Sequence, residues 1–286
     1  MLKQAEPGKI RAALETSMPV PILMYHSISS QASPRLRKST VAPHLFAGHM
    51  AYLAEHYYTS ITVTQFVKAL TGPKLGLPER PVILTFDDGF VDFYTDVLPI
   101  LQHYNFIATL YITTAFVGAK HWLKYEDGLT KPMLNWDQIA EISAAGIECG
   151  AHSHSHPQLD TLPEVVARDE IMHCKRVLEE QLGREVSSFS YPFGHYTPAV
   201  RQWVRAAGYS SACSVKNAIS STVDDPFSLA RLMVTADTSV DNFATMLTDR
   251  SLWVTDPRKG VQIMAMQLLR YGAVQLTRVF PSIATD

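Results

Sequence analysis

The stretch "PVILTFDDGF", residues 81–90, is the best starting point for interpreting this chain. Its first six residues are mostly apolar or β-branched and predict a short buried strand. Two neighbouring carboxylates, Asp87 and Asp88, follow directly, and Gly89 permits the turn that lets both face one cleft. Adjacent acids repel one another, and a divalent cation largely offsets that repulsion. An Asp-Asp-Gly sequence is by itself usually only a turn, so the metal interpretation needs further ligands elsewhere.

Strands and helices alternate along the rest of the chain. We predict further strands at residues 20–28, 108–117, 147–153, 187–193 and 209–215, and helices at 92–105, 137–145, 163–182 and 198–207. Pro99 should kink the first helix, and Thr197 should cap the last. This alternation with short connections predicts a parallel α/β protein, either a barrel or a doubly wound sheet. Chemically suggestive residues recur at the carboxyl ends of the predicted strands, which favours a barrel because barrel active sites lie there.

Composition excludes several classes of protein. The 286 residues are 47% hydrophobic, enough for one large core, and the net charge of −2 gives no basic surface for nucleic acid. The three cysteines are widely spaced and form no zinc or disulfide pattern, which suits a reducing compartment. Residues 1–17 hold no apolar segment typical of a signal peptide, and we find no run of about 18 apolar residues. We therefore expect a soluble, cytoplasmic protein from the chain as given.

A second polar segment, "AHSHSHP" at residues 151–157, supplies three imidazoles. His152, His154 and His156 would share one face of an extended segment, so their spacing alone does not select two ligands. One aspartate with two histidines leaves coordination positions open for water, which suits hydrolysis better than a closed structural site. A histidine triplet alone is often a surface feature. Its place at a strand end, together with the acid pair, makes a metal site the stronger interpretation.

Three segments together resemble the polysaccharide deacetylases of the NodB-homology, carbohydrate esterase family 4 type. The family motif T-F-D-D-G corresponds to residues 85–89, and H-[S/T]-x-x-H-P corresponds to residues 152–157. The third motif, R-x-P-[Y/F]-G, is met only in part by "SYPFG" at residues 190–194. The resemblance covers roughly residues 20–235. It implies an α/β fold of the distorted (β/α)7-type barrel kind, and hydrolysis of an N-acetyl group on an amino sugar.

The resemblance also implies roles for single residues. Asp87 would be the general base, and Asp88 would bind the metal together with His152 and His156, which leaves His154 as a bystander. The metal would be one divalent ion, zinc in the first place, with cobalt or nickel as alternatives. Such an ion would lower the pKa of a bound water and polarise the acetyl carbonyl.

Further roles concern the loops around this centre. Ser153 would stabilise the histidine-bearing loop, and the backbone N–H of Phe193 would contact the oxyanion. Tyr191 would contribute to the same substrate region. Trp136, in "LNWDQI" at residues 134–139, is a candidate groove wall for a sugar face. An equally good interpretation of Trp136 is a residue at a helix start that packs on the core.

Two departures from the family pattern affect the expected chemistry. Ser190 stands where the family has the arginine that orients the base, and no histidine follows His195 to serve as the usual late catalytic acid. The opening "ILMYHSI" is similar to a permuted branch that includes poly-β-1,6-N-acetylglucosamine deacetylases, in which His26 would supply the acid. The alternative for His26 is a buried structural histidine. Arg231, in the apolar run "LARLMV" at residues 229–234, needs a carboxylate partner and could replace the missing arginine beside Asp87.

We divide the chain into an N-terminal extension (1–17), a deacetylase domain (18–256) and a C-terminal amphipathic helical tail (257–286). Residues 258–280 of the tail contain four basic residues and no acid. A helix docked on the barrel wall is the favoured interpretation of this segment. The alternative is a peripheral contact with an anionic membrane, which would place the protein beside a lipid-linked glycan.

The leading functional prediction is a metal-dependent hydrolase that removes N-acetyl groups from an amino-sugar polysaccharide or glycan precursor. A second prediction is a deformylase or deacetylase of a small nucleotide- or lipid-linked sugar. A third is a catalytically inactive relative that only binds carbohydrate. Retention of both acids and both ligand histidines argues against the third.

Overall fold

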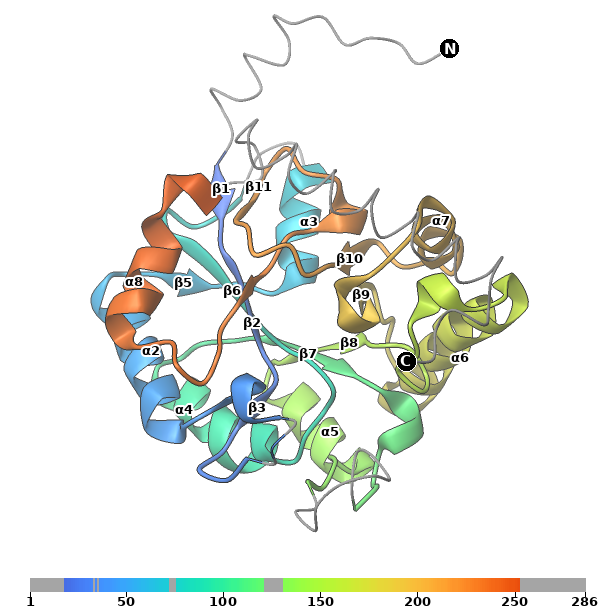
Figure 1. Ribbon diagram of the computed structural model, residues 1–286, viewed down its shortest axis with the longest axis horizontal. Helices are drawn as coiled ribbons and strands as arrows, with labels where there is room; N and C mark the ends of the chain where they lie inside the picture. The colour runs from blue at the N-terminus through green and yellow to red at the C-terminus, as the bar shows by residue number, and fades with distance from the viewer. Residues whose placement is uncertain (1–17, 33, 35, 72–75, 121–130, 253–286) are drawn as a thin grey trace, which may run out of the picture.

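A curled parallel sheet forms the centre of the protein, and helices surround it (Figure 1). The computed structural model describes residues 18–32, 34, 36–71, 76–120 and 131–252. The strands run in the order β10-β9-β8-β7-β6-β2-β12, with β5 also paired to β6. The predicted class, a distorted (β/α)7-type barrel, is confirmed. The strands of this sheet are β2 (Ile22–Tyr25), β5 (Thr59–Ser60), β6 (Pro81–Phe86), β7 (Thr109–Ile112), β8 (Glu148–Ala151), β9 (Ser188–Ser190), β10 (Ser211–Cys213) and β12 (Leu232–Met233).

The helices cover the outside of the sheet, as Figure 1 shows. Predicted helix 92–105 is divided into a π-helical turn, η2, and α4, with Pro99 near the junction between them. The hydroxyl of Thr197 accepts from the N–H of Val200 and caps α7 as predicted. Besides short 3-10 turns, the helical elements are α2 (Pro43–Glu55), α3 (Val63–Thr71), η2 (Phe93–Val97), α4 (Leu98–His103), α5 (Trp136–Ala144), α6 (Glu164–Leu182), α7 (Pro198–Ala206) and α8 (Val240–Thr248).

The first predicted strand, residues 20–28, is interrupted in the structure. Pro21 separates β1 (Pro19–Val20) from β2, and His26 separates β2 from β3 (Ser27–Ile28). Proline has no N–H to donate to a strand ladder, which explains the first break. Two small sheets result, since β1 pairs antiparallel with β11 (Ser220–Ser221) and β3 pairs parallel with β4 (Thr40–Val41).

The two edges of the curled sheet meet at residues 229–233, which we call the seam. Leu229 forms a parallel bridge to Cys213 of β10, and Leu232 and Met233 pair with β2 at the opposite edge. Arg231 therefore lies between the two edges.

The interior beneath the seam is filled by the side chain of Tyr111 from β7. Its hydroxyl is 2.7 Å from Oγ of Ser188, and the guanidinium carbon of Arg231 lies 5.7 Å from its ring centre. A Cβ atom on Gly150 would lie 2.6 Å from this ring, so glycine is required there. Tyr111 thus supports Arg231 from below.

His49 connects α2 to α8 and to the sheet. Its ring stacks on Phe243 at 4.3 Å, its Nε2 lies 2.9 Å from the carbonyl of Thr238, and its Nδ1 lies 3.1 Å from the hydroxyl of Tyr25. A carbonyl can only accept, so Nε2 carries the proton and Nδ1 accepts from tyrosine. Burial lowers the pKa of His49. The imidazole is therefore neutral in the folded protein near pH 7.

The predicted extension (1–17) and tail (257–286) lie outside the described residues, so the docked-helix and membrane interpretations of the tail stay predictions. In the described part of the chain, none of the helices combines the length and apolar character needed to cross a membrane.

Candidate metal and catalytic site

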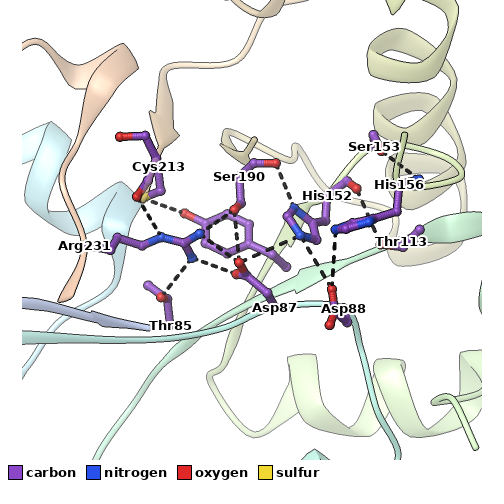
Figure 2. A network of polar contacts seen from close by, with 12 residues as sticks. Thr85, Asp87, Asp88, Thr113, His152, Ser153, His156, Ser190, Cys213 and Arg231 are labelled. Carbon is purple, nitrogen blue, oxygen red and sulfur yellow. Dashed lines mark hydrogen bonds and ion pairs between the residues drawn. The ribbon is translucent and has the colours of Figure 1, made fainter. Parts of the chain in front are cut away.

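Four strand ends bring the predicted site residues to one rim of the barrel. His26 follows β2, Asp87 and Asp88 follow β6, His152 follows β8, and Ser190 ends β9. The strands are parallel, so their carboxyl ends open on the same side. Figure 2 shows the resulting network, in which both aspartates face the histidines.

Asp88, His152 and His156 form a group that fits a metal ion. Each offers one ligand atom, and these atoms all lie within 4.8 Å of one another. Oδ1 of Asp88 is 3.6 Å from Nε2 of His152 and 3.7 Å from Nε2 of His156. Two ligands held tetrahedrally by zinc at roughly 2.1 Å lie about 3.4 Å apart. The distances from Asp88 to both histidines are therefore close to those of a zinc site.

Both histidines are in the protonation state that a metal requires. Nδ1 of His152 donates to the carbonyl of Ser190 at 2.8 Å, which leaves the lone pair of Nε2 directed at the acids. Burial lowers the pKa of His152, and burial lowers the pKa of His156 to about 3. Both imidazoles are therefore neutral at pH 7 and can act as ligands.

The charge of Asp88 also fits a cation. Burial and the neighbouring charge of Asp87 raise the pKa of Asp88 well above its usual range. No arginine or lysine of the described residues forms an ion pair with it. A divalent ion would supply the positive charge that this carboxylate needs.

Asp87 has such a partner within the protein. Arg231 donates from Nη1 to Oδ1 of Asp87 at 2.7 Å and from Nη2 to Oδ2 at 2.8 Å, which is a bidentate pair. Burial alone would raise the pKa of Asp87, but the charge of Arg231 and its hydrogen bonds outweigh it and hold that pKa well below its usual range. Asp87 is therefore ionised at neutral pH.

The remaining N–H groups of Arg231 are also used. Nη1 donates to Oγ1 of Thr85 at 3.2 Å, Nη2 to Oγ of Ser190 at 2.9 Å, and Nε to the carbonyl of Ser214 at 3.3 Å. An arginine side chain has five N–H groups, and each has an acceptor here. The guanidinium is 0% exposed, so these contacts replace all of its hydration. The pairing suggested for Arg231 is thus present in the structure.

The hydroxyl of Ser190 contacts both members of the Asp87–Arg231 pair. This hydroxyl lies 3.4 Å from Oδ2 of Asp87 and accepts from Arg231, so it joins the two charged groups. The contacts of Thr85 and Ser214 with Arg231 were not foreseen from the sequence. Thr85 could have been suspected because it is the first residue of the motif T-F-D-D-G. Ser214 could not, because it contacts Arg231 through its backbone carbonyl, which any residue has.

Backbone strain is concentrated at the site. Asp88, Ser153, His156 and Phe193 have φ angles of 82°, 62°, 61° and 59°. Left-handed conformations of residues other than glycine cost about 1–3 kcal/mol each and persist only where the surroundings hold them. One such contact runs from the N–H of His156 to Oγ of Ser153 at 3.0 Å. The hydroxyl of Ser153 thus joins the two ends of the loop.

The third motif places one aromatic ring at the rim and another in the core. Phe193 is 50% exposed, and its ring centre lies 4.7 Å from that of His156. Tyr191 is fully buried, and its hydroxyl donates to the carbonyl of Phe227 at 3.0 Å. The side chain of Tyr191 therefore packs beneath the turn. Because this side chain is buried, only the backbone of Tyr191 could contact a substrate.

The other predicted residues lie around the centre. Nδ1 of His26 is buried and has no hydrogen-bond partner among the described residues. Burial, opposed by the charge of Asp87, lowers the pKa of His26 to about 4. Trp136 begins α5 and packs, half-buried, against the main core. His154 is outside the ligand group, with Nδ1 2.9 Å from Oγ1 of Thr114.

Comparison with known proteins agrees with this geometry. Residues 74–212 match the sequence model of the polysaccharide deacetylase family. The Bacillus subtilis protein YxkH, which is named for the polysaccharide deacetylases, is 29% identical over 85% of this chain and 82% of its own length. The poly-β-1,6-N-acetyl-D-glucosamine N-deacetylase of Escherichia coli K12 is 30% identical over 52% of this chain, but the match spans only 24% of that enzyme.

Solved structures give the same result for the fold. The Streptococcus pyogenes deacetylase PplD, solved in complex with acetate, superposes with a TM-score of 0.72 and 25% identity over 82% of this chain and 100% of its own. The IcaB structure from Ammonifex degensii has a TM-score of 0.68 over 81% of this chain and 97% of its own, and at 23% identity it supports the fold alone. A polysaccharide deacetylase domain thus matches residues 74–212, and over most of its length the chain is similar to proteins named as deacetylases.

Proposed function

We propose that the protein is a metal-dependent deacetylase that hydrolyses the linear amide bond of N-acetyl groups on an amino-sugar polysaccharide or glycan precursor. The observation that carries the proposal is the pairing of a base held by arginine, Asp87, with an adjacent group of three ligand atoms. The E. coli relative named for poly-β-1,6-N-acetyl-D-glucosamine supports this polymer as the first substrate to test.

Asp88, His152 and His156 would hold the ion, for which zinc is our first choice and cobalt or nickel the alternatives. When bound, a divalent ion lowers the pKa of water and polarises a carbonyl. Asp88 supplies the anionic ligand and the two neutral imidazoles complete the set. Asp87 stays out of the ligand set because Arg231 engages both of its oxygens.

Asp87 would act as the general base. Its Oδ2 lies 3.8 Å from Nε2 of His152, so it borders the ligand group. Arg231 fixes the orientation of the carboxylate and keeps it ionised, which are the two properties that a base needs before the reaction begins. We assign Arg231 as the positioning residue that the family pattern otherwise places at 190.

His26 would protonate the departing amine. A pKa of about 4 means that its imidazole is neutral at pH 7 before substrate arrives. Negative charge that develops on the substrate raises the proton affinity of a nearby imidazole, so His26 would take up the proton that the attacking water releases and would pass it to the leaving nitrogen. A histidine poised in this way can serve as the acid limb of hydrolysis.

Two aromatic residues would complete the substrate region. The backbone N–H of Phe193 is the candidate donor to the oxyanion, since the turn at this residue is held in a strained, fixed conformation. The exposed ring of Phe193 and the half-buried ring of Trp136 are candidate surfaces for sugar faces.

Acetate release tests this proposal. The purified protein, stripped with a chelator and reloaded with zinc, should release acetate from β-1,6-linked N-acetylglucosamine oligomers, and Asp87→Asn should not. Formate release from a formylated sugar, or activity only on a nucleotide-linked sugar, would favour the small-substrate alternative. A zinc-loaded protein that releases neither product from any of these would contradict the proposal and favour the carbohydrate-binding relative.

A further inference from the structure

The three residues between the two ligand histidines form an irregular loop whose shape decides where His156 lies. Ser153 and His156 both have left-handed backbones, with φ angles of 62° and 61°. Such a pair of conformations does not persist without outside contacts. The hydrogen bond from His156 to Ser153 lies within the loop and cannot fix the loop to the rest of the protein.

Glu170 of α6 supplies the outside contact. Its carboxylate accepts from the N–H of Ser155 at 2.7 Å and from Oγ of Ser155 at 2.6 Å. Its backbone carbonyl accepts from the N–H of His154 at 3.1 Å. One residue of a long helix therefore receives three hydrogen bonds from two successive residues of the loop.

His154 strengthens the same attachment without facing the metal group. Its carbonyl accepts from the N–H of Ala115 at 2.8 Å, and its Nδ1 lies 2.9 Å from Oγ1 of Thr114. Its ring lies 4.3 Å from the ring of His173 on α6. The middle histidine of the triplet is thus part of the support of the loop.

We propose that Glu170 is a positioning residue that sets the metal affinity of the site by fixing the loop that carries His156. This inference rests on the proposed ligand set. Ser155 directly precedes His156, and the carboxylate holds both the peptide N–H and the hydroxyl of Ser155. Carboxylate acceptors make short, strong hydrogen bonds. Without them the segment that carries Ser155 and His156 would be less fixed, and part of it would have to be ordered each time a metal binds. Outer partners of metal ligands typically change metal affinity by about 10- to 100-fold when removed.

Zinc affinity measured against a competing chelator tests the proposal. Glu170→Ala should weaken zinc binding about 10-fold, at the lower end of that range because Glu170 touches the ligand only through Ser155. Ser155→Ala, which removes one of the two carboxylate contacts, should weaken it less. Glu170→Gln keeps an acceptor oxygen and should bind nearly as the wild type does. Glu180→Ala is the matched control, because Glu180 is an exposed acid of the same helix that, among the residues described, pairs only with Arg176, at 3.5 Å.

Two further readouts separate positioning from general stability. At saturating zinc, Glu170→Ala should regain nearly wild-type turnover, since Glu170 touches no reacting atom. The visible spectrum of its cobalt form should differ from that of Glu180→Ala, because the geometry of one ligand is less fixed. Equal zinc affinity and identical cobalt spectra for these two variants would overturn the inference while leaving the proposed function intact. A wild-type protein that binds neither zinc nor cobalt would remove the proposed ligand set itself, and this inference with it.

Discussion

Replacement of Arg231 by methionine is the most informative perturbation of this site. Methionine has a similar length, so the packing over Tyr111 is largely kept while every polar contact of the guanidinium is lost. Asp87, which is only 3% exposed, would keep the hydroxyl of Ser190 at 3.4 Å but lose the guanidinium that engages both of its oxygens.

The structure sets the size of the expected effect. Removal of one partner from a buried ion pair costs about 3–5 kcal/mol, because the other charge is left uncompensated. For a protein of this size that loss corresponds to a fall in Tm of about 6–20 °C. An unpaired, buried Asp87 would also bind a proton and cease to act as a base. Turnover should therefore fall by about 10²–10⁴, the range of general base catalysis.

Urea unfolding and acetate release check both parts of this prediction. Arg201→Met is the control, because Arg201 pairs with Asp225 at 2.7 Å but its side chain is 40% exposed, and such pairs contribute about 0–1 kcal/mol. The double variant Asp87→Asn with Arg231→Met should be more stable than Arg231→Met alone, since no buried charge remains. The reasoning would be refuted if Arg231→Met unfolded at the same urea concentration as Arg201→Met and kept its turnover.

Four other predictions address single residues. His156→Ala should lose the metal and His154→Ala should keep it, which metal analysis of the purified proteins will decide; full occupancy in His156→Ala would contradict the ligand set. Asp87→Asn should retain metal yet lose nearly all acetate release, and near wild-type release would exclude it as the base. His26→Ala should slow turnover by about 100-fold or more without affecting metal content, whereas an unchanged rate would assign His26 a structural role. Folding lowers the pKa of His49, so the unfolded state binds a proton first as the pH falls below about 6.5. The free energy of unfolding is therefore unaffected by His49 above that pH and decreases below it, by at most about 1.4 kcal/mol per pH unit. His49→Gln should therefore show a shallower loss of unfolding free energy between pH 6.5 and 5, and equal slopes would disprove the linkage.

Local sequence patterns were sufficient for the features that a few consecutive residues specify. The strand at residues 81–86 has the predicted bounds, and the acid pair and the histidines meet because they end parallel strands of one sheet. The bounds of α6 and α7 agree with the predicted helices to within one residue, since proline and glycine mark their ends.

The elements that were missed carry weaker local signals. Helix α2 was not predicted for two reasons. Its N-cap residue, Ala42, has no side chain that could accept a capping hydrogen bond, and the polar residue His49 interrupts the apolar pattern of its buried face. Strand β12 has two residues, too few for any periodicity. The pairing of Arg231 with Asp87 joins positions that are 144 residues apart, so only the unusual charge in an apolar run could suggest it.

The placement of the guanidinium in the seam has a consequence for how such enzymes can diverge. Ser190 and Arg231 both contact Asp87, and neither is exposed. Restoring arginine at position 190 would force two cations against one buried carboxylate, and the reverse exchange would leave the carboxylate with none. The two positions are 41 residues apart, so an exchange of the arginine between them needs two separate substitutions. If the substitutions occur one at a time, we expect the intermediate protein to fold poorly or to be inactive. We therefore expect the two positions to be inherited as a pair, so that a serine in the third motif directs the search for the arginine to the seam.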